Sequence, residues 1–89
     1  MRKISGNVQL EVTLLDGTRT ATERIAQVMF ASDGDACQFV ELMARGELLE
    51  TPDACSVFAY SSDYPGVWAE AYDEGNGPVV MSGTHEDDA

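Results

Sequence analysis

The most regular feature of the chain is a strict alternation of polar and apolar residues over Asn7–Leu14. Because successive side chains of a β-strand point to opposite faces, this pattern predicts a strand that is buried on one face. Asp16-Gly17 follows directly, and this dipeptide accepts the positive φ angles of a type I′ turn. We therefore predict a hairpin in which residues 18–30 return antiparallel to the first strand.

The sequence is compatible with two structures for the returning segment, residues 18–30. The first is a strand paired through a two-residue turn, a register that sets Val8 opposite Ile25, Val12 opposite Ala21, Thr13 opposite Thr20 and Leu10 opposite Glu23. The last of these pairs places an apolar side chain against a charged one, which counts against the register. The second is a short helix from Thr22, because Thr20 and Glu23 have the spacing of a capping box.

The next segment has the pattern of an amphipathic helix. Ser32 is a favourable N-cap, and Asp35 adds negative charge to the first turn, where it complements the helix dipole. Apolar residues then recur at i, i+3, i+4 and i+7, namely Ala36, Phe39, Val40 and Met43. Arg45 and Gly46 are typical of a C-terminal turn. We therefore predict a helix of about three turns, followed by a link over residues 47–52.

Two runs rich in aromatic and β-branched residues, 55–62 and 67–72, are separated by a strong turn signal at residues 64–66. They predict a second hairpin. Residues 73–77 predict a further turn, and residues 78–81 a short final strand whose leading proline suits the edge of a sheet. The expected order is β-β-α-β-β-β, an α+β domain of two layers with one helix packed on an antiparallel sheet.

One folded domain is expected over residues 1–83, with residues 84–89 as an acidic, mobile end. At 44%, the hydrophobic content is too high for a disordered chain, despite a net charge of −11. A chain of 89 residues buries a modest share of its surface, so a deep active-site cleft is not expected.

The charge is polarised along the chain. All five basic residues lie in the first 45 positions, whereas residues 46–89 carry ten carboxylates and no Lys or Arg. Nucleic acids and anionic membranes would repel such a protein, so we expect it to bind neither directly, and its natural partners are basic protein surfaces. The alternative is that the acidity serves solubility alone.

No residue pattern predicts a catalytic or metal site. His85 lies among the acids of the chain end, where nothing rigid would orient it as a general base. Cys37 and Cys55 form no Cys-x-x-Cys pair and have no basic neighbours in sequence, so free, reduced thiols are expected. The acidic loops at Asp33 and Asp73 lack the glutamate that an EF-hand requires at its twelfth position. We expect no enzymatic activity and no cofactor.

The strand over residues 67–72 separates small side chains from large ones. Its valine and alanines share one face, and Trp68, Glu70 and Tyr72 share the other. Small residues leave room for a helix, so the second face is expected to meet solvent. Exposed rings beside carboxylates are typical of a protein interface. The alternative is that Trp68 and Tyr72 are core residues covered by the terminal strands.

The acidic half of the chain supports a resemblance at the level of a protein class. A chain of this length is roughly 30 Å across, a distance over which one DNA strand presents about nine phosphates. The acids in question are Glu47, Glu50, Asp53, Asp63, Glu70, Asp73 and Glu74. In size and charge the chain resembles the small acidic phage and mobile-element proteins that block bacterial defence complexes, including anti-CRISPR proteins and antirestriction DNA mimics. These proteins share no sequence motif.

The resemblance implies an inhibitor that occupies a Lys/Arg-lined nucleic-acid channel in the bacterial host cytoplasm. The leading hypothesis is therefore a binding protein of this type, with Trp68 and Tyr72 joining the seven acids in the contact. The second hypothesis is an acidic adaptor or structural subunit that docks on a partner protein, including a homodimer formed through an exposed strand edge. A small enzyme ranks third. The longest apolar runs are too short to cross a bilayer, so a cytoplasmic protein without membrane contact is expected.

Overall fold

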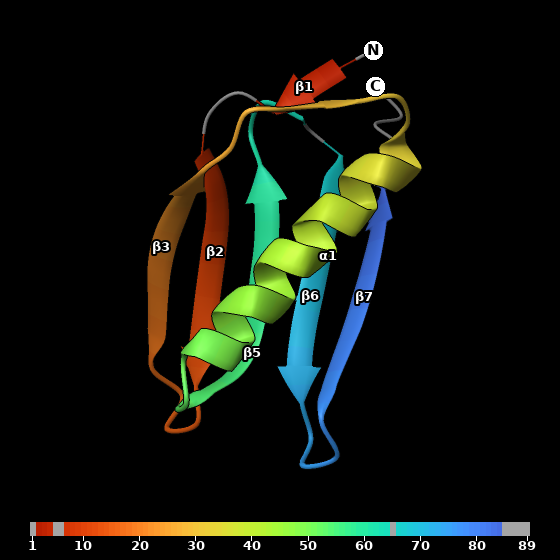
Figure 1. The fold of residues 1–89 in the computed structure, drawn as a ribbon. Helices are drawn as coiled ribbons and strands as arrows, with labels where there is room; N and C mark the ends of the chain where they lie inside the picture. Colours follow the sequence, from red (N-terminus) through yellow and green to blue (C-terminus); the bar gives the residue numbers. More distant parts are fainter. Residues whose placement is uncertain (1, 5–6, 65, 85–89) are drawn as a thin grey trace.

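The computed structural model describes residues 2–4, 7–64 and 66–84. A five-stranded antiparallel sheet has the order β3-β2-β5-β6-β7, and one helix lies diagonally across it (Figure 1). The predicted α+β class with one helix on an antiparallel sheet is confirmed. The elements are β1 (Arg2–Ile4), β2 (Asn7–Leu14), β3 (Arg19–Ile25), β4 (Val28–Phe30), α1 (Asp33–Glu50), β5 (Ala54–Ser61), β6 (Val67–Asp73) and β7 (Pro78–Thr84).

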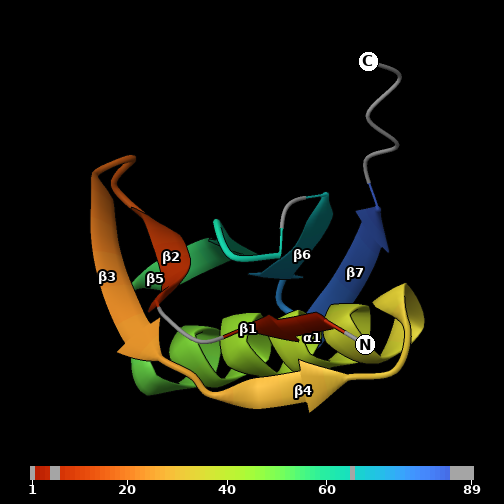
Figure 2. The ribbon, with the colours of Figure 1, turned by 90° about the horizontal axis from the view of Figure 1, so that it is seen from above.

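The two short strands β1 and β4 form a separate antiparallel sheet that the sequence did not predict. Figure 2 shows this pair beside α1 at one end of the domain, where the chain crosses from β3 to the start of the helix. Each strand has only three residues, too few to show an alternation. Ile4 and Phe30 are nevertheless buried, so the pair belongs to the hydrophobic core.

The alternation over β2 predicted its buried face correctly: Val8, Leu10 and Val12 are buried. The predicted register against β3 is wrong by one residue. Val8 faces Arg24 instead of Ile25, and the other observed pairs are Leu10 with Thr22, Val12 with Thr20 and Thr13 with Arg19. The alternative helix from Thr22 is also wrong, because residues 19–25 and 28–30 form strands.

The hairpin turn explains the shifted register. The Leu14 amide donates to the Thr18 carbonyl at 2.8 Å, which encloses three residues in the turn instead of two. Gly17 adopts a positive φ of 89°, where a residue with a side chain would be strained. The Asp16 carboxylate accepts a hydrogen bond from the Thr18 amide at 2.9 Å, which holds the pKa of Asp16 below its usual value. The longer turn moves the charged Glu23 away from Leu10 and sets it opposite Gln9.

Helix α1 begins as predicted but ends later. Ser32 is the N-cap, and its hydroxyl accepts a hydrogen bond from the Asp35 amide at 3.2 Å. The predicted end at Arg45-Gly46 is wrong, and so is the predicted link at residues 47–52, because the helix continues to Glu50. Ala44, Glu47 and Leu48 continue the buried stripe. This burial outweighs the cost of about 1 kcal/mol for glycine inside a helix.

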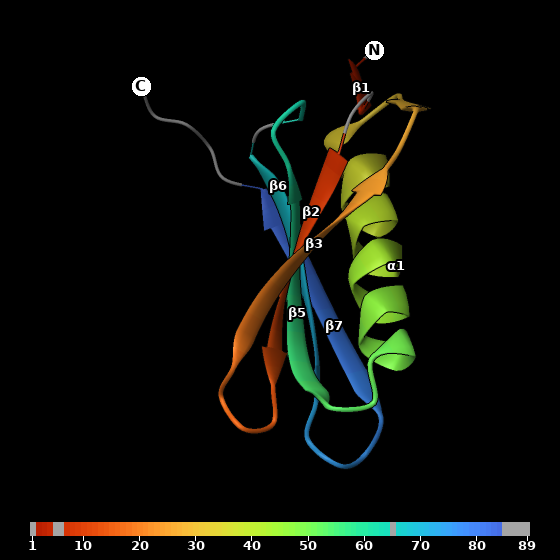
Figure 3. The ribbon, with the colours of Figure 1, turned by 90° about the vertical axis from the view of Figure 1, so that its left-hand side faces the viewer.

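The core lies between α1 and the middle of the sheet. On the helix, Val40 and the small residues Ala36 and Ala44 face the core. On the sheet they are met by Val57, Ala59, Ala69 and Ala71, and all seven residues are fully buried. Small residues on both surfaces allow the helix to lie close to β5 and β6. The two layers are plain in Figure 3, where α1 covers one side of the sheet and no described element covers the other.

The second hairpin is confirmed. β5 and β6 pair antiparallel with Phe58 opposite Glu70, and β7 forms the sheet edge, as its leading proline suggested. The final strand runs to Thr84, beyond the predicted end at Met81, so Thr84 belongs to the sheet and not to a mobile end. Residues 85–89 of the predicted end, His85 among them, lie outside the described residues.

Cys37 and Cys55 are free thiols, as expected. The Cys37 thiol donates to the carbonyl of Gly83 at 3.6 Å. Burial raises the pKa of this thiol above its ordinary value of 9.0. A hydrogen bond with Ser82 lowers the pKa in part, whereas the negative charges of Asp33 and Glu41 raise it further. The fold therefore favours the protonated thiol, a preference that is present below pH 9.0 and is lost as the pH rises through the raised pKa.

We expect iodoacetamide to alkylate Cys37 more slowly in the folded protein than in urea-denatured protein at the same pH. The thiolate is the reacting species, and the fold lowers its fraction. The measurement is the labelling rate of the Cys37 peptide, followed by mass spectrometry over a series of pH values. Faster labelling of the folded protein would contradict an inert thiol.

Candidate functional site

The site is built on the side of the sheet that points away from α1, which we call the open face. Alternation along each strand and the observed register bring residues from all five strands of the sheet together there. They are Asn7, Gln9, Glu11, Thr13, Arg19, Ala21, Glu23, Ile25, Ser56, Phe58, Tyr60, Trp68, Glu70, Tyr72, Val79, Met81 and Gly83.

Aromatic rings form the centre of the open face. Phe58 and Trp68 are nearly parallel, with an interplanar angle of 16° and centroids 6.0 Å apart, and Tyr60 is tilted by 45° to Phe58 at 5.9 Å. Trp68 lies across Gly83 of β7, where an added Cβ would meet the indole at 3.0 Å. These rings are only partly buried, since no described element packs over them. An array of this kind is typical of a binding surface.

Two carboxylates flank the central ring. Glu11 of β2 and Glu70 of β6 stand on either side of Phe58 in one row across the sheet. Within the described part of the chain, neither carboxylate has a hydrogen bond or an ion pair. Glu23, by contrast, accepts hydrogen bonds from the amides of Asn7 at 2.6 Å and Gln9 at 2.9 Å. Both flanking charges are therefore available to a cationic partner.

Two hollows lie on either side of Phe58. One has a volume of about 410 Å³ and is bounded by Glu11, Phe58, Tyr60 and Trp68. The other, of about 390 Å³, is bounded by Glu11, Glu70, Phe58 and Arg19. Arg19 is the only basic side chain on the open face among the described strand residues. Among the described lining residues, the first hollow has one carboxylate, no basic residue and three aromatic rings, whereas the second has two carboxylates, one arginine and one aromatic ring.

The structure brings together some of the predicted site residues. Trp68, Glu70 and Tyr72 share the open face, as the alternation of their strand predicted, and all three are partly buried. Asp73 ends β6, and Glu74 follows it in the turn before β7. Asp53 lies in the turn before β5 at this same end of the sheet, whereas Asp63 lies in the β5–β6 turn at the opposite end (Figure 1).

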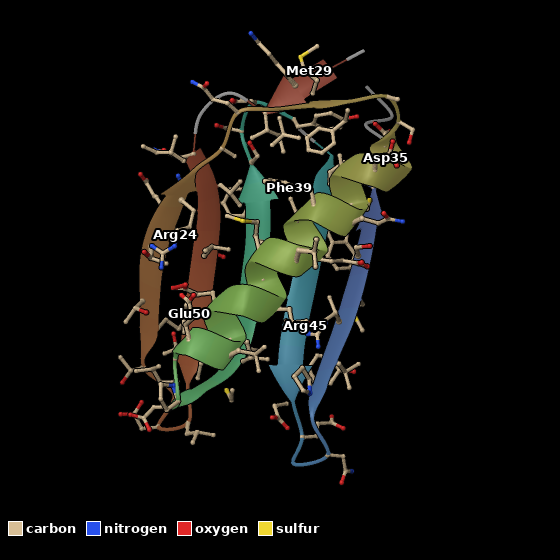
Figure 4. The ribbon with its side chains drawn as sticks, viewed as in Figure 1. Arg24, Met29, Asp35, Phe39, Arg45 and Glu50 are labelled. Atoms are coloured by element: carbon tan, nitrogen blue, oxygen red, sulfur yellow. The ribbon has the colours of Figure 1, made fainter. Side chains whose placement is uncertain are left out.

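Glu47 and Glu50 lie apart from these residues. They belong to α1 and therefore to the covered side of the sheet. Arg24 of β3 donates to Glu47 at 3.0 Å and lies 3.9 Å from Glu50 (Figure 4). Glu47 is only 9% exposed, so this pair neutralises a carboxylate inside the fold. One flat partner surface does not reach both these two acids and Glu70.

Comparison of the chain with known protein families finds no matching family model. Searches of curated protein sequences and of solved structures likewise find no significant match.

Sequence reasoning missed Glu11, Phe58 and Tyr60. The alternation in residues 55–62 would have placed Phe58 and Tyr60 on one face, but only the pairing of β2 with β5 shows that Glu11 lies beside them. Within residues 2–4, 7–64 and 66–84, no cluster of His, Cys, Asp or Glu is arranged to hold a metal ion. The same residues include no helix with the length and apolar character needed to cross a bilayer. The open face thus offers rings and unpaired carboxylates, which are groups that recognise cations.

Proposed function

We propose that the chain is an acidic binding protein that docks the open face of its sheet on a Lys/Arg-lined surface of a partner protein. The observation that carries the proposal is the row in which Glu11 and Glu70 flank Phe58 on an uncovered aromatic face. The partner surface is one that otherwise binds nucleic acid, so docking inhibits the partner. Under this proposal the protein acts as an inhibitor of the DNA-mimic type.

Electrostatics and apolar contact support this proposal in different ways. A net charge of −11 attracts a basic surface over a distance and accelerates encounter. Once the surfaces meet, the rings supply the buried area that stabilises a complex, and aromatic residues carry a large share of binding energy at protein interfaces. The same charge repels nucleic acid, so competition would take place on the partner and not on this protein.

The test begins with affinity capture of partners from a bacterial lysate at low salt, followed by purification of a captured protein. Labelled nucleic acid bound to that protein should be displaced by this chain in a concentration-dependent manner, and the complex should weaken steeply as salt rises. Displacement that is absent, or a complex that is insensitive to salt, would contradict inhibition by occupation of a basic surface.

The second candidate is an adaptor held mainly by apolar contact. The observation that favours it is the exposure of Val79 and Met81, at 43% and 42%, on the open side of the edge strand β7. Exposed apolar side chains on an edge strand suit strand addition by a partner or by a second copy. An adaptor complex should tolerate salt and leave nucleic-acid binding by the partner unchanged.

A further inference from the structure

We propose that the hollow bounded by Glu11, Phe58, Tyr60 and Trp68 is a binding site for one arginine side chain of the partner. The inference rests on the proposed function, because it names the group on the basic surface that the open face recognises. The guanidinium would stack on the aromatic rings, and its N–H groups would donate to the Glu11 carboxylate.

The rings have an arrangement that suits a flat cation. Phe58 and Trp68 are within 16° of parallel, so their faces have nearly the same orientation. The face of an aromatic ring carries negative potential and attracts a cation placed over it. Gly83 lets the indole lie across the backbone of β7, since an added Cβ would approach it to 3.0 Å.

Glu11 supplies the charge at this site. It is opposite Phe58 in the pairing of β2 with β5, and residues paired in this way have Cβ atoms about 5 Å apart. Its carboxylate has no ion pair in the described part of the chain, so it is available to accept from a ligand. A carboxylate beside aromatic faces favours arginine over lysine, because only guanidinium both stacks flat and donates two parallel hydrogen bonds.

The neighbouring hollow does not share these properties. It also contacts Glu11, Glu70 and Phe58, but Arg19 lines it, and this positive charge offsets one of the two carboxylates. Phe58 is the one aromatic ring among its described lining residues, so a guanidinium would have no second ring to stack on. The hollow beside Trp68 has no basic residue among its described lining residues. Its volume of about 410 Å³ exceeds what a guanidinium needs, so there is room for the aliphatic stem of the arginine as well.

The experiment uses three peptides that differ in one residue: acetyl-Gly-Arg-Gly-amide, its lysine analogue and its citrulline analogue. Trp68 is the only tryptophan of the chain, so its fluorescence reports directly on the hollow. We expect a saturable change with the arginine peptide, weaker binding of the lysine peptide, and an affinity for the citrulline peptide that is lower by about tenfold or more, since the charge-assisted hydrogen bonds are lost.

Glu11→Gln should lower the affinity for the arginine peptide by about tenfold, because the charge-assisted hydrogen bonds are again lost. The matched control is Asp35→Asn, which removes one negative charge from an exposed residue in the first turn of α1 and should leave the affinity within about twofold. Gly83→Ala is an independent variant, since it displaces the indole without changing any charge. It should shift the fluorescence emission of Trp68 and lower the affinity for the arginine peptide.

Any one of three results would overturn the arginine site. They are equal affinities for the arginine and citrulline peptides, no saturable change in fluorescence with the arginine peptide, and an unchanged affinity of the Glu11→Gln variant for that peptide. The proposed function would survive any of these results if the chain still displaces nucleic acid from a captured partner. Conversely, selective binding of the arginine peptide without any displacement would uphold the site and contradict the inhibitor.

Discussion

The double variant Glu11→Lys and Glu70→Lys is expected to lower the affinity for a basic partner by a factor of about 100 or more. The change moves the net charge from −11 to −7, but its main effect is local, because two carboxylates beside Phe58 become two ammonium groups. Like charges facing each other across an interface cost several kcal/mol. The measurement is the dissociation constant for the captured partner at low salt, with circular dichroism as a check on folding.

The control is the double variant Asp35→Lys and Glu50→Lys, which changes the net charge by the same amount on the helix side of the molecule. It should bind within a few-fold of the wild type, because long-range steering mainly changes the association rate. If the open-face variant is folded and binds as tightly as the wild type, the open face is not the contact. The acids Asp53, Asp73 and Glu74 at one end of the sheet would then be the next surface to test.

Features of the fold that depend on near neighbours in sequence were predictable. The alternation of β2 and the N-cap at Ser32 were both found, because each is determined within one strand or one helical turn. The same holds for β6, where the sequence assigned Trp68 and Tyr72 to the face away from the helix. In the two strands the period of the sequence pattern matches that of the backbone, and the N-cap depends on one hydrogen bond three residues along the chain.

Features that depend on distant contacts were not predictable. The end of α1 was placed at Gly46, but packing of Leu48 against the sheet extends the helix. The register of β2 against β3 depends on one additional turn residue, which the turn encloses because the Leu14 amide donates to the Thr18 carbonyl. A shift of one residue exchanges the two faces of a strand relative to its partner.

The candidate site was found only in part for the same reason. The charge count along the chain treated residues 46–89 as one acidic surface, yet Arg24 pairs with Glu47 from 23 positions away. The open face, in turn, depends on Glu11 and Phe58, which become neighbours only through the pairing of β2 with β5. Neither the ion pair nor the strand pairing can be inferred from the sequence before the order of the strands is known.

Phe30→Ala is expected to cause a large loss of stability, about 3–5 kcal/mol. Phe30 is 5% exposed, and its ring packs against Phe39 of α1 at 5.4 Å and edge-on against Tyr64 at 5.7 Å. The Tyr64 hydroxyl donates to Asp33 at 2.8 Å, so this ring cluster also holds the start of the helix. Since a domain has only about 5–15 kcal/mol of stability in total, the variant should unfold at a much lower urea concentration, followed by far-UV circular dichroism.

Two further variants separate the cause of this loss. Phe30→Leu retains most of the apolar volume and should cost clearly less than the alanine variant. Met29→Ala removes a neighbouring side chain that is 57% exposed in the same strand and should change stability by less than about 0.5 kcal/mol. If Phe30→Ala is no more damaging than Met29→Ala, the β1–β4 pair is not anchored in the core. The five-stranded sheet and α1 would then have to be stable without it, because β4 supplies no other buried side chain.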